Sequence, residues 1–263
     1  MSSHATALPE PGAAPRTRVR RVRNRDIVPG VLAGLARALG HAPQRSALLK
    51  ALWIEAKRHA APHVTSVEAT RLLGIERANV RGPAWRYCPL LVAAIAMLAE
   101  CRTIFEFGTY RGDTTWLLAH NVPDARVYTL DLPGPEAMRS ASLELTDPEY
   151  FATFERGTRF RDTPEAERIV QLFGDAADFD FTPYRGAMDL VYVDASHSYS
   201  YVRSDTEAAL GMLSEGGTIV WDDYTYYSGI WTYLNELAPA LDRPIYHLRD
   251  TRLALYSRRD LVA

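Results

Sequence analysis

Acidic side chains and a histidine cluster in the second half of the sequence, where two apolar stretches end. The first stretch is followed by Asp194 and His197, and the second by Asp222 and Asp223. If the two stretches are neighbouring strands about 4.8 Å apart, carboxylates at their ends can converge on one cation. Oxygen ligands suit a hard divalent ion such as Mg²⁺. We predict that Asp194, Asp222 and Asp223 bind this metal; the alternative is that these acids cap the helices that follow.

His197 stands three residues beyond Asp194. If a helix begins there, the two side chains lie one turn apart on the same side, so that His197 faces the metal. The metal would favour the neutral imidazole, which can accept a proton from a hydroxyl. His197 is therefore the candidate general base.

A second group of candidate residues lies in the segment FEFGTYRGDTTW. Glu106 precedes a turn between Gly108 and Gly112, where a ligand can approach the backbone closely. Tyr110 occupies the place of the second glycine in the nicotinamide-binding pattern G-x-G-x-x-G, which argues against an oxidoreductase. Asp131 follows at the end of the next apolar stretch and can accept hydrogen bonds from both hydroxyls of a ribose. These residues predict a site for a nucleoside-containing cofactor.

The elements that must position these residues follow a regular alternation after Glu100. Short apolar strands alternate with amphipathic helices, which predicts βαβ units and a parallel sheet. The predicted strands are Thr103 to Phe107, Arg126 to Leu130, Ile169 to Phe173, Leu190 to Val193 and Thr218 to Trp221. Ile245 to Leu248 and Leu253 to Tyr256 are separated by a short polar turn around Asp250, so they must pair antiparallel. The expected fold is a doubly wound, mostly parallel seven-stranded α/β sheet that ends in an antiparallel hairpin.

The chain is expected to have three regions. Residues 1–25 are rich in arginine and poor in large apolar groups, which predicts a disordered basic tail. The apolar spacing of residues 26–100 indicates a helical N-terminal region, which includes a buried helix over Leu90 to Leu98. Residues 101–263 form the cofactor-binding domain. Within it, the charged stretch 133–168 is predicted to be a helical insertion near the substrate entrance.

With these motifs in place, residues 102–258 resemble the class I S-adenosylmethionine-dependent methyltransferases, whose domain is Rossmann-like. The pattern E-x-G-x-x-x-G from Glu106 looks like their motif I, whose loop wraps the amino-acid end of the cofactor. Gly174 and Asp175 match the place where the family commonly contacts adenine, although such a pair is equally suited to a helix N-cap. The resemblance implies nine cofactor-binding residues: Glu106, Gly108, Thr109, Tyr110, Gly112, Thr114, Asp131, Asp175 and Asp194.

The segment VYVDASHSYSYVRSDTEAALGMLSEGGTIVWDDY narrows the resemblance. It is similar to the metal-dependent branch that includes the macrocin and mycinamicin sugar O-methyltransferases and the cephalosporin-hydroxylase-like proteins. The resemblance implies Mg²⁺ at Asp194, Asp222 and Asp223, with His197 as the base, and O-methylation of a small molecule such as a natural-product or glycan sugar. Catechol O-methyltransferases carry lysine at the base position. A metal-independent methyltransferase and a non-catalytic module of the same fold stay open as alternatives.

Composition limits the kinds of partner. The net charge of -2 and a pI near 6.4 give no electrostatic case for binding nucleic acid. The longest apolar run, Leu90 to Ala99, is far shorter than the roughly 20 residues of a membrane span. The N-terminus lacks the order of a signal peptide. We therefore expect a cytoplasmic enzyme with a small-molecule acceptor and no membrane partner; homo-oligomer formation is left open.

Overall fold

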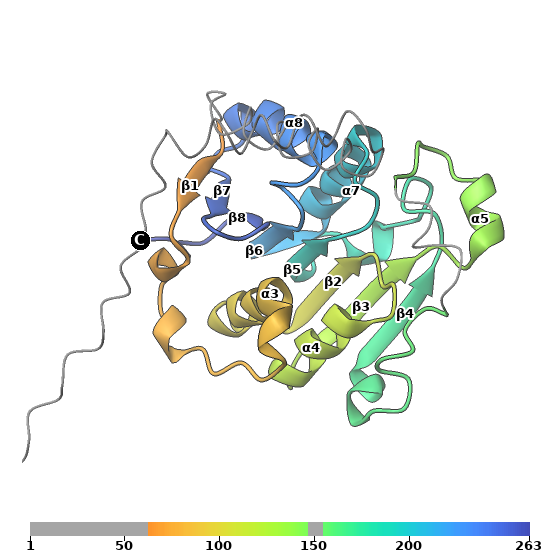
Figure 1. Ribbon diagram of the computed structural model, residues 1–263, viewed down its shortest axis with the longest axis horizontal. Coiled ribbons are helices and arrows are strands. Elements are labelled where there is room, and N and C mark those ends of the chain that lie inside the picture. Colours follow the sequence, from red (N-terminus) through yellow and green to blue (C-terminus); the bar gives the residue numbers. More distant parts are fainter. Residues whose placement is uncertain (1–62, 147–154) are drawn as a thin grey trace, which may run out of the picture. The chain divides into compact units, whose positions relative to one another are not determined.

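One eight-stranded sheet forms the centre of the molecule, for which a computed structural model describes residues 63–146 and 155–263 (Figure 1). The strands are β1 (Thr65–Val67), β2 (Thr103–Phe107), β3 (Arg126–Asp131), β4 (Ile169–Phe173), β5 (Met188–Val193), β6 (Leu213–Trp221), β7 (Tyr246–Leu248) and β8 (Ala254–Ser257). Their order across the sheet is β1-β7-β8-β6-β5-β2-β3-β4. Pairing is parallel except where β8 runs antiparallel to β6 and β7. This architecture confirms the predicted fold class.

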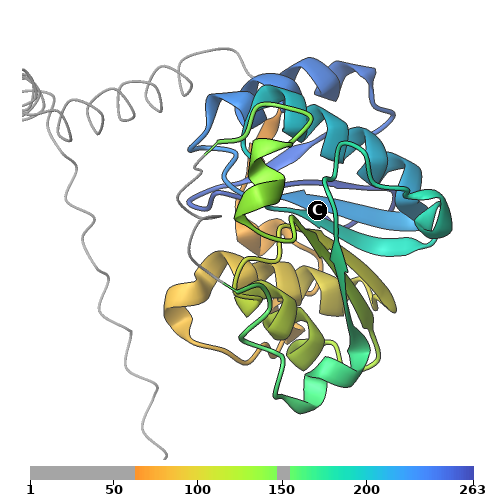
Figure 2. The ribbon, with the colours of Figure 1, turned by 90° about the vertical axis from the view of Figure 1, so that its right-hand side faces the viewer.

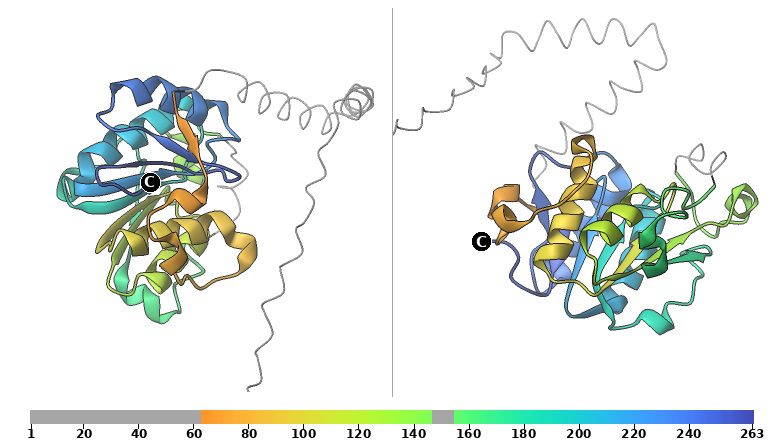
Figure 3. Two further views of the ribbon diagram at one scale, coloured as in Figure 1. Left: turned by 90° about the vertical axis from the view of Figure 1, so that its left-hand side faces the viewer. Right: turned by 90° about the horizontal axis from the view of Figure 1, so that it is seen from below.

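The central strands are apolar along almost their whole length because helices cover both faces of the sheet. Ile104 and Phe105 of β2 are both fully buried, although they point to opposite faces. Helices α3 (Tyr87–Leu98) and α4 (Asp113–Asn121) pack on one face, and α7 (Tyr199–Met212) and α8 (Ser228–Leu237) on the other (Figures 2 and 3). The sheet is therefore the middle layer of three, as predicted for a doubly wound fold.

The eighth strand corrects two expectations. Seven strands were expected, but β1 adds to the sheet edge by parallel pairing with β7. The part of region 26–100 that is described is also not all helical. Before α3 it holds β1 and three short 3-10 helices, η1 (Ala69–Arg71), η2 (Ile75–Arg77) and η3 (Ala84–Arg86). The segment Val64 to Val67 is rich in β-branched residues, which favour extended backbone once a partner strand is available.

The remaining elements are short. The predicted hairpin is confirmed as β7 and β8, with Asp250 in the turn at a positive φ of 62°. Within stretch 133–168 the structure has α5 (Pro135–Arg139) and η4 (Pro164–Arg168), whereas 147–154 lie outside the described residues. Two more 3-10 helices are η5 (Thr182–Tyr184) and η6 (Ala238–Ala240). The predicted tail 1–25 and residues 26–62 of the predicted helical region also lie outside the described residues. No helix in the described ranges is long and apolar enough to cross a membrane.

Candidate active site

A cavity of about 310 Å³ opens at the carboxyl ends of the central strands. This is where ligands bind in open α/β sheets, because loops from neighbouring strands diverge there. Seven of the predicted site residues line it: Gly108, Tyr110, Asp131, Asp175, Asp194, His197 and Asp223. As far as the described residues define the cavity, Glu106, Thr109, Gly112, Thr114 and Asp222 do not border it. The predicted residues are thus divided between the lining of the cavity and positions that do not border it.

The two glycines of the loop after β2 are required by packing within the protein. Gly108 has φ 91°, and a Cβ there would lie 2.1 Å from the backbone oxygen of Asp194. Gly112 has φ 83°, and its Cβ would lie 2.5 Å from the ring of Phe160. A side chain at either position would also be strained by the positive φ. Gly108 therefore holds the ends of β2 and β5 together beside the cavity, and Gly112 supports the loop from behind.

Glu106 is a buried support of the same loop. Its carboxyl group accepts hydrogen bonds from Thr115 and, at 2.6 Å, from Thr129. Thr129 lies 2.7 Å from Thr109, hydroxyl to hydroxyl. Burial raises the pKa of Glu106 to about 8, against the opposing effect of the two threonines. Thr115, which contacts Glu106, is the neighbour of Thr114 in the first turn of α4. The predicted cofactor contact at Thr114 stays a prediction.

One oxygen of Asp131 contacts both a backbone N–H and a guanidinium group. Its Oδ2 accepts the backbone N–H of Tyr110 at 2.7 Å and lies 3.0 Å from Nε of Arg156. Burial raises the pKa of Asp131, and Arg156 is the largest opposing influence. Arg156 also lines the cavity. Sequence reasoning missed Arg156, because it lies in a charged stretch without periodicity or motif.

Asp175 borders the cavity, but its oxygens have partners from the chain. Oδ1 accepts from Tyr201 Oη at 2.9 Å and from the N–H of Ala177 at 3.0 Å, and Oδ2 accepts from the N–H of Ser142 at 2.8 Å. The bond to the residue two positions on is typical of an aspartate turn. The predicted adenine contact at Asp175 stays a prediction.

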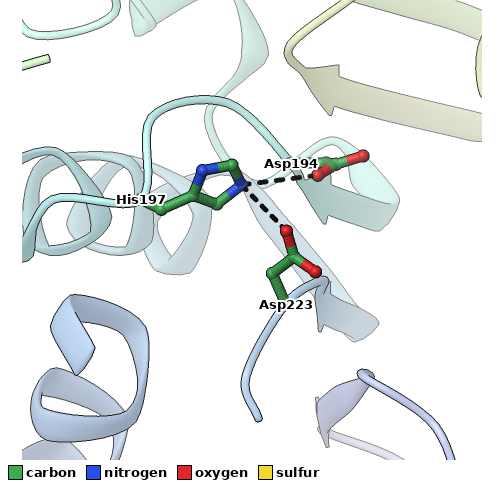
Figure 4. Close-up of side chains that lie close together, drawn as sticks. All are labelled: Asp194, His197 and Asp223. Carbon is green, nitrogen blue, oxygen red and sulfur yellow. Dashed lines mark ion pairs between the residues drawn. The ribbon is translucent and has the colours of Figure 1, made fainter. Parts of the chain in front are cut away.

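Asp194, His197 and Asp223 come together as a cluster at the ends of β5 and β6 (Figure 4). His197 Nε2 lies 3.9 Å from Oδ1 of Asp194 and 3.4 Å from Oδ2 of Asp223. One donor atom from each residue lies within 4.8 Å of the others. The helix after β5 begins at Tyr199, so Asp194 and His197 lie in the loop before it and not on one helical face. Loop geometry, and not helical spacing, makes them neighbours.

His197 is held in a fixed orientation. Its backbone N–H donates to Oγ1 of Thr146 at 2.8 Å, and its ring stacks on Tyr227 with 4.1 Å between centroids. The side chain is 14% exposed. Burial, followed by the charge of Asp222, raises the pKa of Asp194 to about 6, and His197 opposes this shift. The cluster therefore joins two carboxylates and an oriented imidazole at the cavity surface.

Asp222 does not join this cluster. Its Oδ2 accepts from Tyr192 Oη at 2.7 Å and from Nη2 of Arg252 at 3.2 Å, and its side chain is only 3% exposed. Arg252 also pairs with Asp223 at 3.0 Å. Tyr192 donates in addition to Asp194 at 3.2 Å. Asp222 thus lies next to the cluster without lining the cavity, and it shares Tyr192 and Arg252 as partners with Asp194 and Asp223.

Comparisons with known proteins give a matching domain and a shared fold. Residues 105–224 match a family model described as a methyltransferase domain, and they include both Glu106 and Asp223. A protein from Staphylococcus aureus, assigned as a caffeoyl-CoA O-methyltransferase, superimposes with a TM-score of 0.50 and 16% identity, over 80% of this chain and 98% of its own. This likeness shows a shared fold.

Two further structures are similar at lower scores. The O-methyltransferase TomG of Streptomyces achromogenes, involved in tomaymycin synthesis and in complex with S-adenosylmethionine, gives a TM-score of 0.46 and 18% identity over 73% of this chain and 89% of its own. An O-methyltransferase from Bacillus cereus, in complex with S-adenosylhomocysteine, gives 0.44 and 18% over 69% and 84%. No curated protein sequence matches the chain. Residues 105–224 therefore match a methyltransferase domain, and the chain has the fold of the Staphylococcus aureus protein.

Proposed function

We propose that the chain transfers the methyl group of S-adenosylmethionine to a hydroxyl group of a small molecule, with a divalent cation, Mg²⁺, at the cluster of Asp194, His197 and Asp223. One observation carries the proposal. This cluster and the loop at Gly108 and Asp131 border the same cavity, so a nucleoside donor and a hydroxyl acceptor can meet there. The acceptor class that the resemblance implies is a natural-product or glycan sugar.

The cavity suits the donor in size and in lining. Its volume lies at the lower end of the range of about 300 to 1,000 Å³ that is usual for small-molecule sites. Asp131 is the carboxylate that would accept a ribose hydroxyl, and Gly108 lets the chain pass close to the ligand. We retain Gly108, Tyr110, Asp131, Asp175 and Asp194 as direct contacts. For the other four predicted residues, Glu106, Thr109, Gly112 and Thr114, we propose a supporting role behind the loop.

The donor set suits a hard cation. Two carboxylate oxygens are ligands that Mg²⁺ and Mn²⁺ prefer, whereas a single imidazole does not decide the metal. Asp194 and Asp223 would hold the ion. When bound, it would neutralise their charge and acidify a nearby acceptor hydroxyl. Asp222 is not among the proposed ligands, because Tyr192 and Arg252 already contact its Oδ2.

The chain's residues would then act as follows. His197, oriented by Thr146 and Tyr227, takes the acceptor's hydroxyl proton at Nε2. The oxygen attacks the methyl carbon in line, so the new O–C bond forms as the S–C bond breaks. The products are the methyl ether and S-adenosylhomocysteine. The chain contributes chiefly by positioning the reactants and by placing charge.

An alternative role for His197 is that of third metal ligand, because its Nε2 points to both carboxylates (Figure 4). A ligand imidazole cannot also accept the hydroxyl proton. The two roles predict different results for metal binding by a His197 variant.

Binding measurements test the proposal before any acceptor is known. S-adenosylhomocysteine at about 100 times its Kd should stabilise the protein by about 2.7 kcal/mol, seen as a thermal shift. NADH at the same concentration is the control and should give no shift. A protein that responds to neither would be a non-catalytic module.

Metal dependence is tested with a hydroxylated acceptor found by screening sugars and other small molecules. Turnover should stop in EDTA and return with added Mg²⁺. Full turnover in EDTA would establish the metal-independent alternative, in which Asp194 and Asp223 only shape the cavity.

A further inference from the structure

The segment that follows residue 154 lies against the glycine loop after β2. The backbone N–H of Gly157 donates to the oxygen of Tyr110 at 3.0 Å, and that of Arg159 donates to the oxygen of Arg111 at 2.8 Å. These two bonds align 157–159 with the centre of the loop. The segment therefore packs along one side of the glycine loop, although about 45 residues separate the segment from the loop in sequence.

Side-chain packing fixes the same contact. The ring of Phe160 occupies the space beside Gly112 that a Cβ would fill. Gly157 has φ 70°, and a Cβ there would lie 2.3 Å from Oε1 of Gln171. The segment is therefore packed closely against the loop at Gly112 and against Gln171 of β4 at Gly157. Arg156, directly before Gly157, is consequently held at a fixed position.

That position places the Arg156 guanidinium on Asp131. The two side chains are 4% and 5% exposed, and Nε lies 3.0 Å from Oδ2. Two charges removed from water to this degree are costly unless they are paired. The same Oδ2 accepts the N–H of Tyr110, so the glycine loop, β3 and the 155–160 segment meet at one atom. Arg156 also lines the cavity.

We propose that Arg156 is a positioning residue for the nucleoside end of the cofactor, acting through Asp131. Tyr110 and Arg156 occupy Oδ2, so a ribose hydroxyl that approaches without displacing them meets Oδ1. The Asp131 carboxylate then accepts a hydrogen bond from the ribose through one oxygen in one orientation. Its two oxygens are not equally available to the two ribose hydroxyls. This inference rests on the proposed function, because it requires that the cavity bind S-adenosylmethionine.

The test measures the Kd of S-adenosylhomocysteine by calorimetry for the full chain and its variants. Arg156→Met should weaken binding by about 10- to 100-fold, the range for loss of one short polar contact to a charged group. Arg156→Lys keeps the charge and should recover part of the affinity. The matched control is Arg159→Met, since Arg159 belongs to the same segment, packs over Trp116 and does not line the described cavity. The control should bind like the wild type.

A double-mutant cycle separates positioning from a general effect on folding. If Arg156 acts through Asp131, Arg156→Met should cost little further affinity in an Asp131→Asn background. The double variant leaves no unpaired buried charge, so it provides the measurement even if Arg156→Met does not fold. Additive losses, or equal binding by wild type and Arg156→Met, would overturn the inference. Absence of binding by the wild type would instead overturn the proposed function.

Discussion

The two halves of the cavity balance their charges differently. At the ends of β2 and β3, Asp131 is paired with Arg156 and with a backbone N–H, and Glu106 is buried among threonines. At the ends of β5 and β6, three carboxylates meet one arginine and one imidazole. In the first half, both carboxyl groups have partners from the protein. In the second half, the carboxylates outnumber the cationic partners, so negative charge is concentrated at the cavity. A neutral ribose suits the first half, and a cation suits the second.

The largest effect should come from His197. In His197→Gln, loss of the proposed base should lower methyl transfer by about 10² to 10⁴-fold. Mn²⁺ affinity, measured by electron paramagnetic resonance, should stay within a few-fold of wild type, because the two carboxylates remain. If Mn²⁺ binding disappears together with turnover, His197 is a ligand and another group must take the proton.

The second largest effect should come from Asp223. Asp223→Asn removes a proposed metal ligand and should weaken Mn²⁺ binding by more than about 100-fold, which is the upper end of the loss seen when only a residue that supports a ligand is changed. Affinity for S-adenosylhomocysteine should hardly change if the two halves are independent. Asp124→Asn is the matched control, since Asp124 is 70% exposed and pairs with Arg102 away from the described cavity.

A smaller effect is expected for Asp222, the neighbour of Asp223. Asp222→Asn keeps a side chain that can bond to Tyr192 and Arg252, so Mn²⁺ binding should fall by only about 10-fold, the lower end of the range for a residue that supports a ligand. An equal loss in Asp222→Asn and Asp223→Asn would mean that both acids bind the metal, as the sequence alone suggested. The comparison of two adjacent aspartates thus decides which ligand set is correct.

The positions of Asp222 and Asp223 also show what could not be predicted from the sequence. Strands such as β2 and β5 were predictable, because parallel strands covered on both faces are continuous apolar runs. Asp194, directly after β5, was predictable as a cavity residue. Which of Asp222 and Asp223 turns toward the cavity was not, since it depends on a positive φ of 56° at Asp223 and on Arg252, which is 29 residues further along.

Tertiary partners explain the other omissions. β1 is three residues long and owes its place to pairing with β7, which is about 180 residues away in the chain. Arg156 carries no local signal, because its role comes from Asp131 and from the fit of Phe160 beside Gly112. Contacts of this kind follow from the folded chain and leave no period or motif in the sequence.

The smallest predicted effect concerns Glu106, in the half of the cavity whose carboxyl groups have partners from the protein. Its pKa is about 8 in the folded chain, against 4.5 as its ordinary value, so the folded state binds more protons between these values. Its contribution to stability is fully present below about pH 4.5 and is lost as pH rises toward 8. Glu106→Gln should therefore gain stability relative to wild type as pH rises, by at most about 1.4 kcal/mol per pH unit.

Urea unfolding at pH 5.5 and pH 8 measures this difference. Glu167→Gln, which changes an exposed glutamate, should leave the pH dependence of wild type unchanged. Parallel stability curves for Glu106→Gln and wild type would show that the buried carboxyl group does not take up a proton on folding. In that case Glu106 would carry a negative charge beside the loop, and the contrast between a neutralised donor half and a charged cation half would no longer hold.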